Sequence, residues 1–457
     1  MATNSRKRMK RQILWTIVTL LMAGLFYGVF YINSLLTIIT GYPAKYLCSA
    51  VFISNRAQTE VEAMDLHFSF IKYTQNEVNF QDSSVTSSFL WKKSKAIYRK
   101  GFGATLLRGV DEKDLRKIKF PESAAKYDQD TIAWPLGNIM PDTITNIDTL
   151  RLARITKKLM EDDGYKGHAF AFMVVHKGIA VTESYQPEFN AKTRFLSWSM
   201  AKSFTNTLAG IMVKNGKWDI NQPINITEWK TDDRKQITYN NLMQAESGLQ
   251  WNEDYGNRSD VTVMLYCKND FARFVFDQPL EAPVGSKWYY SSGNPNVVTY
   301  QIRQTLHNDH EYYQFPYTQL FDKIGMPNAL FEVDASGTFV GSSYIYATAR
   351  DYARYGLLHL QDGVFNGERI LPEGWVSYST SPNAQSKGEY GSLFWLNKSK
   401  KLPSAPDDMY WCQGYDGQRI FIIPSKELIV VILGFSHKPD HAMDFDALLS
   451  DILKTIN

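Results

Sequence analysis

The sequence predicts an α+β fold, in which helices flank one antiparallel sheet that carries a helical insertion, preceded by one N-terminal transmembrane helix. Three observations support this. An uncharged apolar segment, residues 13–32, lies near the N-terminus. Pairs of apolar strands occur near residue 175 and again near residue 425. The long stretch between these pairs is helical and rich in loops, as expected when distant segments build one sheet.

The N-terminal segment reads ILWTIVTLLMAGLFYGVFYI, and twenty helical residues are enough to cross a hydrocarbon layer of ~30 Å. Five basic residues precede it: Arg6, Lys7, Arg8, Lys10 and Arg11. Their bias predicts that residues 1–12 form a cytoplasmic tail and that the chain after Asn33 is extracytoplasmic, in the periplasm if the source is a Gram-negative bacterium. A cleaved signal peptide is the alternative, but its apolar region usually has ~7–15 residues and no A-x-A site follows. We therefore favour an uncleaved signal anchor.

Composition excludes several classes of protein. Hydrophobic residues make up 44% and charged residues 21% of the 457 residues, which indicates a large core rather than a disordered chain. Without the five N-terminal positives, 45 basic residues face 47 acidic ones, so the body carries no basic surface for nucleic acid. The three cysteines are scattered, and the histidine pairs His307/His310 and His437/His441 lack acidic or thiolate partners at metal spacing. We expect neither a metal nor an organic cofactor.

The chain after the apolar segment divides into two parts. Residues 33–146 form an extension without an assigned role, which contains a β-rich stretch from Val85 to Leu107. Residues 147–457 form the main domain, which begins with an amphipathic helix at residues 147–160. Its first strand pair, HAFAFMVVH and IAVTESY, turns at Lys177 and Gly178, and its last pair is QRIFII and ELIVVILG.

A candidate nucleophile lies at the start of an amphipathic helix over residues 197–216 (SWSMAKSFTNTLAGIMVKNG). Ser199 and Lys202 lie one turn apart there, where free N–H groups and the helix dipole favour developing negative charge. A buried lysine can become neutral and act as the base that a serine nucleophile needs. The S-x-x-K pattern alone proves little, because Ser69 to Lys72 and Ser123 to Lys126 match it too.

Two later segments make Ser199 the strongest of these candidates. The first is KWYYSSGNPNVV at residues 287–298, and the second is WCQGYDGQRIFII at residues 411–423. With these segments, residues 147–457 resemble the serine β-lactamase-related and penicillin-binding hydrolases, especially the branch with class C β-lactamases, β-lactamase-like esterases and 6-aminohexanoate-dimer hydrolase. The three motifs of that family align with Ser199-Met200-Ala201-Lys202, Tyr290-Ser291-Ser292 and Cys412-Gln413-Gly414.

The resemblance implies a β-lactamase/transpeptidase-like fold and a set of roles. Ser199 would be the acylated nucleophile, Lys202 its proton partner and Tyr290 a general base or acid. The backbone N–H groups of Ser199 and Tyr415 would form the oxyanion hole. The residues implied in substrate binding are Ser292, Asn294, Cys412, Gln413 and Gly414.

The sequence departs from the family pattern at positions that bear on substrate. Cys412 and Gln413 replace the Lys or His and the hydroxyl residue that help to hold a substrate carboxylate in β-lactamases, and Ser292 stands where class C enzymes have Asn. We therefore expect hydrolysis of a small neutral ester or amide, and inefficient penicillin hydrolysis. One alternative is a D-alanyl carboxypeptidase or penicillin-binding protein. Another, of a different class, is a non-catalytic peptide-binding or interaction module.

Overall fold

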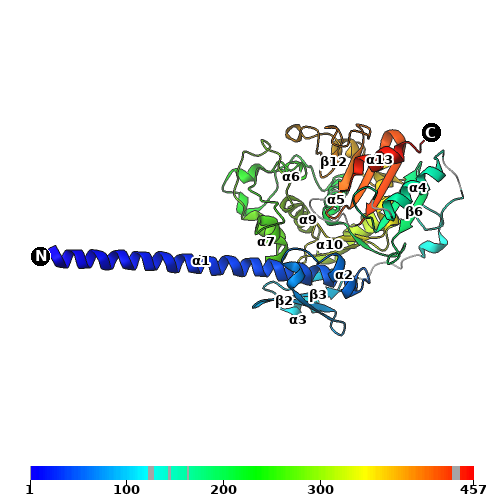
Figure 1. Ribbon diagram of the computed structural model, residues 1–457. Coiled ribbons are helices and arrows are strands. Elements are labelled where there is room, and N and C mark those ends of the chain that lie inside the picture. The colour runs from blue at the N-terminus through cyan, green and yellow to red at the C-terminus, as the bar shows by residue number, and fades with distance from the viewer. Residues whose placement is uncertain (1, 122–127, 143–145, 162–163, 435–442, 457) are drawn as a thin grey trace.

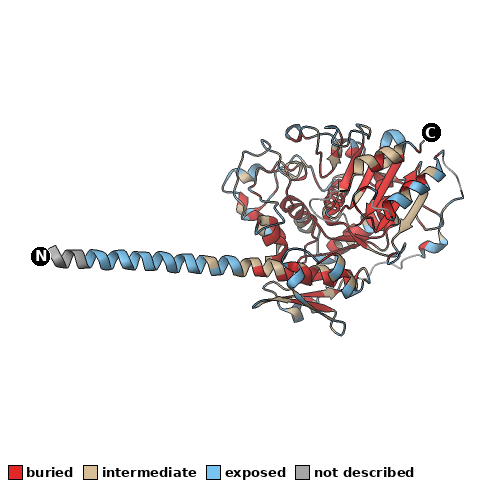
Figure 2. Ribbon diagram, in the orientation of Figure 1, coloured by how far each residue is buried: buried red, intermediate tan, exposed pale blue. Residues whose placement is uncertain are grey.

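The computed structural model describes residues 2–121, 128–142, 146–161, 164–434 and 443–456 (Figure 1). Its first element, α1 (Ala2–Phe52), is much longer than the predicted apolar segment. Within the described residues it is the one helix long and apolar enough to cross a membrane. The apolar side chains from Ile13 to Ile32 are exposed, whereas from Leu36 onward α1 becomes progressively buried in the domain (Figure 2).

The predicted antiparallel sheet of distant segments is confirmed, and its strand order is β12-β13-β14-β15-β5-β6. The strands are β5 (Ala171–His176), β6 (Ile179–Tyr185), β12 (Trp395–Leu396), β13 (Tyr410–Gln413), β14 (Arg419–Ile423) and β15 (Leu428–Leu433). Side chains alternate between the two faces of β5: Met173 and Val175 join the larger core, and Phe172 and Val174 the smaller one. Helix α11 (Ala349–Leu360) covers the first face, and α4 (Thr149–Met160) and α13 (Phe445–Leu453) cover the second.

The helical insertion lies between β6 and β12. It contains α5 (Ala201–Lys214), α6 (Tyr239–Met243), α7 (Asp260–Cys267), α8 (Phe271–Phe276), α9 (Gly293–Thr305), α10 (Asp309–Pro316) and α12 (Trp375–Ser379). Short strands also occur there: β7 (Phe195–Leu196), β8 (Leu330–Phe331) and β9 (Ile345–Ala347) form one small sheet, and β10 (Val364–Phe365) pairs with β11 (Glu368–Arg369). Helix α5 is buried along most of its length, so the residues at its start are held rigidly.

The extension forms a four-stranded antiparallel meander against the last part of α1. Its strands are β1 (Gln75–Asn79), β2 (Ser84–Phe89), β3 (Lys92–Arg99) and β4 (Gly103–Leu106), and its short helices are α2 (Gln58–Met64) and α3 (Glu112–Lys117). In Figure 1, α1 enters the domain between this sheet and α7, and it contacts both.

A buried ion pair joins the extension to the main domain. The carboxylate of Glu332, which has no exposed surface, lies 2.5 Å from the ammonium of Lys45 on α1. The hydroxyl of Ser49 and the backbone N–H of Ala104 also donate to this carboxylate, at 2.9 Å and 2.6 Å. Side chains from α1, the meander and α5 belong to one continuous hydrophobic core. The extension is therefore an integral layer of the folded body.

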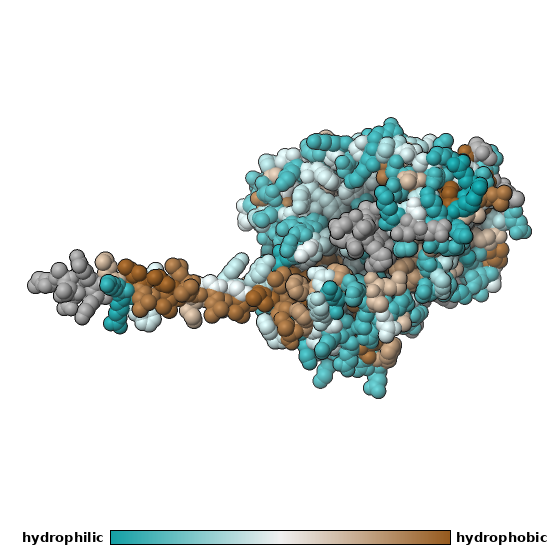
Figure 3. Space-filling model, viewed as in Figure 1, coloured by the Kyte–Doolittle hydropathy of each residue, from teal (hydrophilic) through white to brown (hydrophobic). Residues whose placement is uncertain are grey.

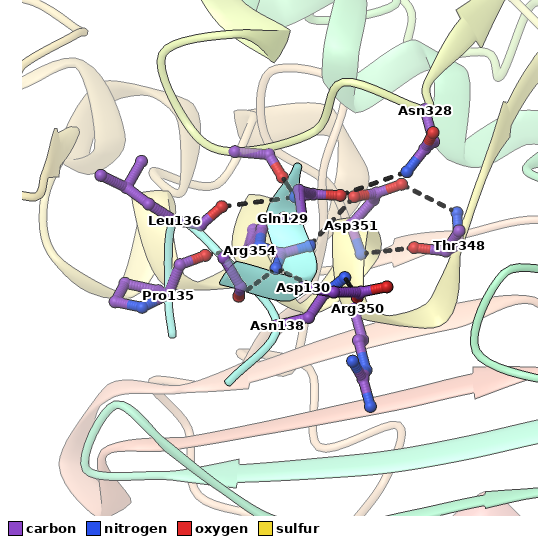
Figure 4. A network of polar contacts seen from close by, with 12 residues as sticks. Gln129, Asp130, Pro135, Leu136, Asn138, Asn328, Thr348, Arg350, Asp351 and Arg354 are labelled. Carbon is purple, nitrogen blue, oxygen red and sulfur yellow. Dashed lines mark hydrogen bonds and ion pairs between the residues drawn. The ribbon is translucent and has the colours of Figure 1, made fainter. Parts of the chain in front are cut away.

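A second polar network fixes residues 128–142 against α11 (Figure 4). The buried guanidinium of Arg354 pairs with Asp351 at 3.1 Å and donates to the carbonyl of Gly137 at 2.6 Å and the side-chain oxygen of Asn138 at 2.9 Å. Gln129 donates to the carbonyl of Gly325 at 2.7 Å. Since Gly137 and Asn138 belong to the extension and Arg354 to α11, the network ties this irregular segment to the main domain.

Candidate active site

Ser199 lies where a short strand turns into a long buried helix. The chain leaves β7, passes through the single turn Trp198–Met200 and continues directly as α5. Trp198 has φ +45°, a left-handed conformation that non-glycine residues rarely adopt. Its ring stacks with Tyr46 and Tyr42 of α1, at centroid distances of 5.9 Å and 6.3 Å. The packing of α1 thus supports the strained residue that presents Ser199.

Lys202 lies one turn after Ser199, and its ammonium nitrogen is 3.0 Å from the Ser199 hydroxyl. The same nitrogen is 2.9 Å from the hydroxyl of Ser292 and 3.0 Å from the carbonyl of Ser342. Burial lowers the pKa of Lys202 to about 8, although the negative charge of Glu253 opposes this shift. A substantial fraction of Lys202 is therefore neutral near pH 8, and neutral lysine can accept the proton of Ser199.

Tyr290 completes a cluster of an alcohol, an amine and a phenol. Its side chain interacts with that of Ser199, and the nitrogen of Lys202 lies 4.9 Å from the centroid of its ring. Burial, with the charge of Glu253 as a second cause, raises the pKa of Tyr290 above its usual value. The phenol therefore keeps its proton in the resting state, which suits a group that gives a proton to a leaving group.

Glu253, which the sequence reasoning missed, lies beside this cluster. Its carboxylate accepts hydrogen bonds from the hydroxyl and the backbone N–H of Ser292, at 2.5 Å and 2.9 Å. The phenol of Tyr255 and the indole of Trp251 also donate to it, at 2.8 Å and 2.5 Å. Ser292 thus bridges Glu253 and Lys202, so the carboxylate acts on the lysine through one hydroxyl group. A single acidic residue in a loop carries no spacing signature, and nothing in the sequence singled it out.

Replacing Glu253 with glutamine should shift the pH profile of hydrolysis. If neutral Lys202 is the base, kcat/KM rises with pH through the pKa of Lys202, near 8. The charge of Glu253 raises that pKa, so Glu253→Gln should move the midpoint to lower pH, by on the order of one unit. The measurement is kcat/KM for a soluble ester from pH 6 to pH 10, roughly the range that brackets the wild-type midpoint.

Asp254→Asn is the matched control for this prediction. Asp254 is an exposed carboxylate next to Glu253, and it bonds to Gly256 and Asn257 within its own loop. We expect its removal to leave the midpoint in place. A Glu253→Gln profile that coincides with the wild type, or moves to higher pH, contradicts the electrostatic role of this carboxylate.

Gly414 brings the end of β13 against the turn that carries Ser199. A Cβ atom at position 414 would lie 2.2 Å from the carbonyl oxygen of Ser197, so the backbones can approach only with glycine here. The next residue, Tyr415, has a backbone N–H that forms no hydrogen bond with the residues described by the structure. The N–H of Ser199 belongs to a first helical turn, where no intrahelical acceptor is available.

The other residues expected to bind substrate differ in placement. Ser292 is part of the cluster around Lys202. Gln413 is partly exposed, and its side-chain oxygen accepts from the indole of Trp411 at 3.1 Å. Asn294 is buried and bonds to Ser247 and to the carbonyl of Leu242. These two bonds hold Asn294 to the segments around residues 242 and 247.

Cys412 has no exposed surface and belongs to the larger core. Burial raises the pKa of its thiol to about 12, so the thiol stays protonated and inert at neutral pH. Its placement is that of a small apolar residue on a strand. Within the described residues, no group of three or more His, Cys, Asp and Glu side chains is arranged to hold a metal ion, and His437 and His441 lie outside those residues.

The comparisons with known proteins agree with this fold. The Beta-lactamase family profile matches residues 152–451. A 6-aminohexanoate-dimer hydrolase of Paenarthrobacter ureafaciens is 23% identical over 299 residues, which cover 59% of this chain and 73% of the relative.

Solved structures share the fold at low sequence identity. A candidate 6-aminohexanoate-dimer hydrolase from Bacillus anthracis has a TM-score of 0.57 and 20% identity, and the match covers 72% of this chain and 88% of that one. A family VIII carboxylesterase has a TM-score of 0.54 and 14% identity, with coverage of 68% and 98%. With the sheet, the buried α5 and the Ser199–Lys202 pair, these matches confirm the resemblance: the chain belongs to the Beta-lactamase family and is a serine β-lactamase-fold hydrolase.

Proposed function

We propose that this protein is a membrane-anchored serine hydrolase that cleaves a small neutral ester or amide through an acyl-enzyme on Ser199. The observation that carries the proposal is the Ser199 hydroxyl, 3.0 Å from a buried lysine whose pKa is lowered to about 8. A tyrosine that keeps its proton interacts with the same serine. Such a set contains a nucleophile, a base and an acid within reach of one reacting carbonyl group.

The reaction follows from these positions. Neutral Lys202 takes the hydroxyl proton as the Ser199 oxygen bonds to the carbonyl carbon, and the carbonyl electrons move to oxygen. The N–H groups of Ser199 and Tyr415 donate to that oxyanion. As the intermediate collapses, the bond to the leaving alcohol or amine breaks. Tyr290 gives the leaving group a proton and regains one from the Lys202 ammonium. A water molecule then attacks the carbonyl carbon of the acyl-enzyme with the same proton transfers. The acid is released, and Ser199 regains its proton.

The third motif and the aromatic side of the cluster support an uncharged substrate. Cys412 and Gln413 stand where the family pattern has a cation and a hydroxyl group. The rings of Tyr290 and Trp395 lie 5.5 Å apart, and Tyr390 packs edge-on against both, so this side of the cluster is aromatic. Two matched proteins carry the name 6-aminohexanoate-dimer hydrolase and a third is called a carboxylesterase, which fits an amide or an ester.

The exposed half of α1 supports anchoring rather than a purely soluble enzyme. Its exposed apolar segment carries Trp15 near one end and Tyr27 with Tyr31 near the other, the arrangement typical of the two interfaces of a bilayer. Basic residues precede the segment, so the catalytic domain would be extracytoplasmic. α1 continues without a break into the core of the domain. Cleavage within the apolar segment would remove the anchor and leave the buried part of α1, after Leu36, in the domain.

Activity-based labelling tests the proposed reaction. A fluorophosphonate probe should label the full-length protein at Ser199, and Ser199→Ala should abolish the labelling because the attacking oxygen is gone. Hydrolysis of p-nitrophenyl esters, a linear amide and nitrocefin then identifies the substrate class. An unlabelled wild type would favour the non-catalytic binding module, and stable labelling by a fluorescent penicillin would favour the D-alanyl carboxypeptidase or penicillin-binding protein.

A further inference from the structure

Two parts of the folded body contact α1 just after its apolar segment ends at Ile32. The ammonium of Lys92, at the start of β3, lies 3.5 Å from the side-chain oxygen of Asn33. The guanidinium of Arg258, in the loop before α7, donates to the hydroxyl of Ser34 at 2.8 Å. Asn33 and Ser34 directly follow Ile32, the last residue of the apolar segment. The β2–β3 hairpin and the loop that carries Arg258 therefore lie at the level where a bilayer around residues 13–32 would end.

The tip of the β2–β3 hairpin is unusual for a surface in water. A two-residue hairpin turn normally contains asparagine, aspartate or glycine, which adopt left-handed conformations easily. Here the turn consists of Leu90, with φ +52°, and Trp91. Their exposed fractions are 68% and 67%. Two large apolar side chains thus project from the tip of a strand pair and stay mostly exposed.

The direction of the hairpin takes this tip toward the apolar segment. Thr40 of α1 bonds to Ser94 of β3 at 2.7 Å, and Asn33 lies beside Lys92, so β3 and α1 run side by side in the same direction. The residues before Lys92 therefore lie at or beyond the level of Asn33. In Figure 3 the hydrophobic surface of α1 continues onto the adjoining part of the domain. If residues 13–32 span a bilayer, Trp91 lies at its interface, where tryptophan is enriched in membrane proteins.

Positive charge surrounds the same place. Lys93 and Arg258 are exposed and Lys92 is half-buried. In the part of the chain that the structure describes, none of the three forms an ion pair, and Lys92 and Arg258 bond to the neutral side chains of Asn33 and Ser34. Unpaired basic side chains next to exposed tryptophan and leucine are the combination that binds phosphate headgroups while the apolar residues enter the interface.

We propose that Leu90, Trp91, Lys92, Lys93 and Arg258 form a second membrane contact, on the anionic surface of the bilayer that α1 crosses. This rests on the anchoring proposed above and adds a defined orientation to it. A single helix leaves the domain free to rotate about the helix axis, whereas a second contact at the side of α1 fixes one face of the domain on the headgroups. The occupant of this surface is the lipid bilayer itself.

The proposed contact is connected to the catalytic cluster. The loop that ends at Arg258 begins at Glu253, and Tyr255 within it lies 3.2 Å from the hydroxyl of Ser292. Tyr42, which stacks on Trp198, is ten residues after Ile32, or about 15 Å along the helix at 1.5 Å per residue. The second contact therefore holds the loop beside Ser199 at the bilayer surface.

Spin labelling of the full-length protein in vesicles of phosphatidylcholine and phosphatidylglycerol tests the contact. A nitroxide is attached to Leu90→Cys in a Cys267→Ser background. The matched control is Phe80→Cys in the same background. Phe80 is 72% exposed and lies at the opposite end of the same sheet, near Phe52 at the far end of α1. Collision rates with oxygen, which partitions into the bilayer, and with a water-soluble nickel complex report the depth of each label.

The label at position 90 should collide more with oxygen than with the nickel complex, and the label at position 80 should show the reverse. Equal accessibility of the two labels to the nickel complex overturns the proposal. Flotation of the labelled protein with the vesicles reports on α1 alone, and hydrolysis of a soluble ester reports on folding and on the proposed reaction. Failure of the anchor would therefore appear in flotation, failure of the proposed reaction in ester hydrolysis, and failure of the second contact in the collision rates.

Discussion

Replacing Lys202 with alanine is expected to lower kcat/KM for a soluble ester by about 10³-fold or more, because the base that activates the serine is lost. In the folded protein no other basic group approaches the Ser199 hydroxyl as closely as the lysine nitrogen, at 3.0 Å, within the described residues. The loss should appear in kcat, since the proposed role of Lys202 is proton transfer and its side chain is buried beside Ser199 and Ser292. Steady-state kinetics with a p-nitrophenyl ester measure it.

Lys214→Ala is the control for this substitution. Lys214 ends the same helix, is exposed and lies at the opposite end of α5 from Ser199. Its removal should leave kcat and KM within a factor of about two, as expected for a surface change away from the site. A Lys202→Ala enzyme that keeps more than a tenth of the wild-type rate would mean that another group takes the serine proton.

Replacing Lys45 with methionine is expected to destabilise the whole folded body. It leaves the carboxylate of Glu332 fully buried without its cation, and breaking a buried pair in this way costs about 3–5 kcal/mol of the free energy of unfolding. Burial raises the pKa of Glu332, and the charge of Lys45 opposes that rise. Without Lys45 the carboxyl should take up a proton more readily, so the loss of stability should be largest at neutral pH and smaller in acid. Thermal unfolding of the detergent-solubilised chain at two pH values measures this.

The double variant Lys45→Met with Glu332→Gln separates the charge from the packing. Glutamine keeps an oxygen that can accept from Ser49 and Ala104 but carries no charge. The double variant should therefore be clearly more stable than Lys45→Met alone. If both variants unfold at the same temperature, the unpaired charge is not the cause of the loss.

Strong periodic signals explain how much of the fold could be predicted from the sequence. The strand pairs at residues 170–185 and 418–434 alternate or run apolar, and they form four consecutive strands, β14-β15-β5-β6, of the six-stranded sheet. The extent of α1 could not be predicted, because residues 33–52 include polar residues, Pro43 and Gly41 that usually argue against a continued helix. Contacts with the meander and α7 stabilise that part of α1, and such contacts have no local signature.

The candidate site was predictable only where its residues share a motif. Ser199 and Lys202 are one helical turn apart, so their closeness follows from the helix itself. Tyr290 and Ser292 come from a segment about ninety residues later, and the family resemblance alone placed them nearby. Glu253 had no such signal, because its role depends on a loop that folds back over Ser292. Cys412 lies in an apolar strand sequence, where a small buried side chain is expected, and the structure buries it there.

The unbroken helix from the apolar segment to the wall behind Ser199 has a mechanical consequence. A flexible Gly- and Ser-rich linker between a membrane anchor and a catalytic domain would let the domain move over tens of ångströms above the lipid. In this protein no flexible linker separates the apolar segment from the domain, since Tyr42 and Tyr46 of α1 itself stack on Trp198. In the proposed membrane-anchored form, the hydroxyl of Ser199 would therefore stay at one fixed height above the lipid, and substrate molecules farther from the membrane would have to diffuse to it.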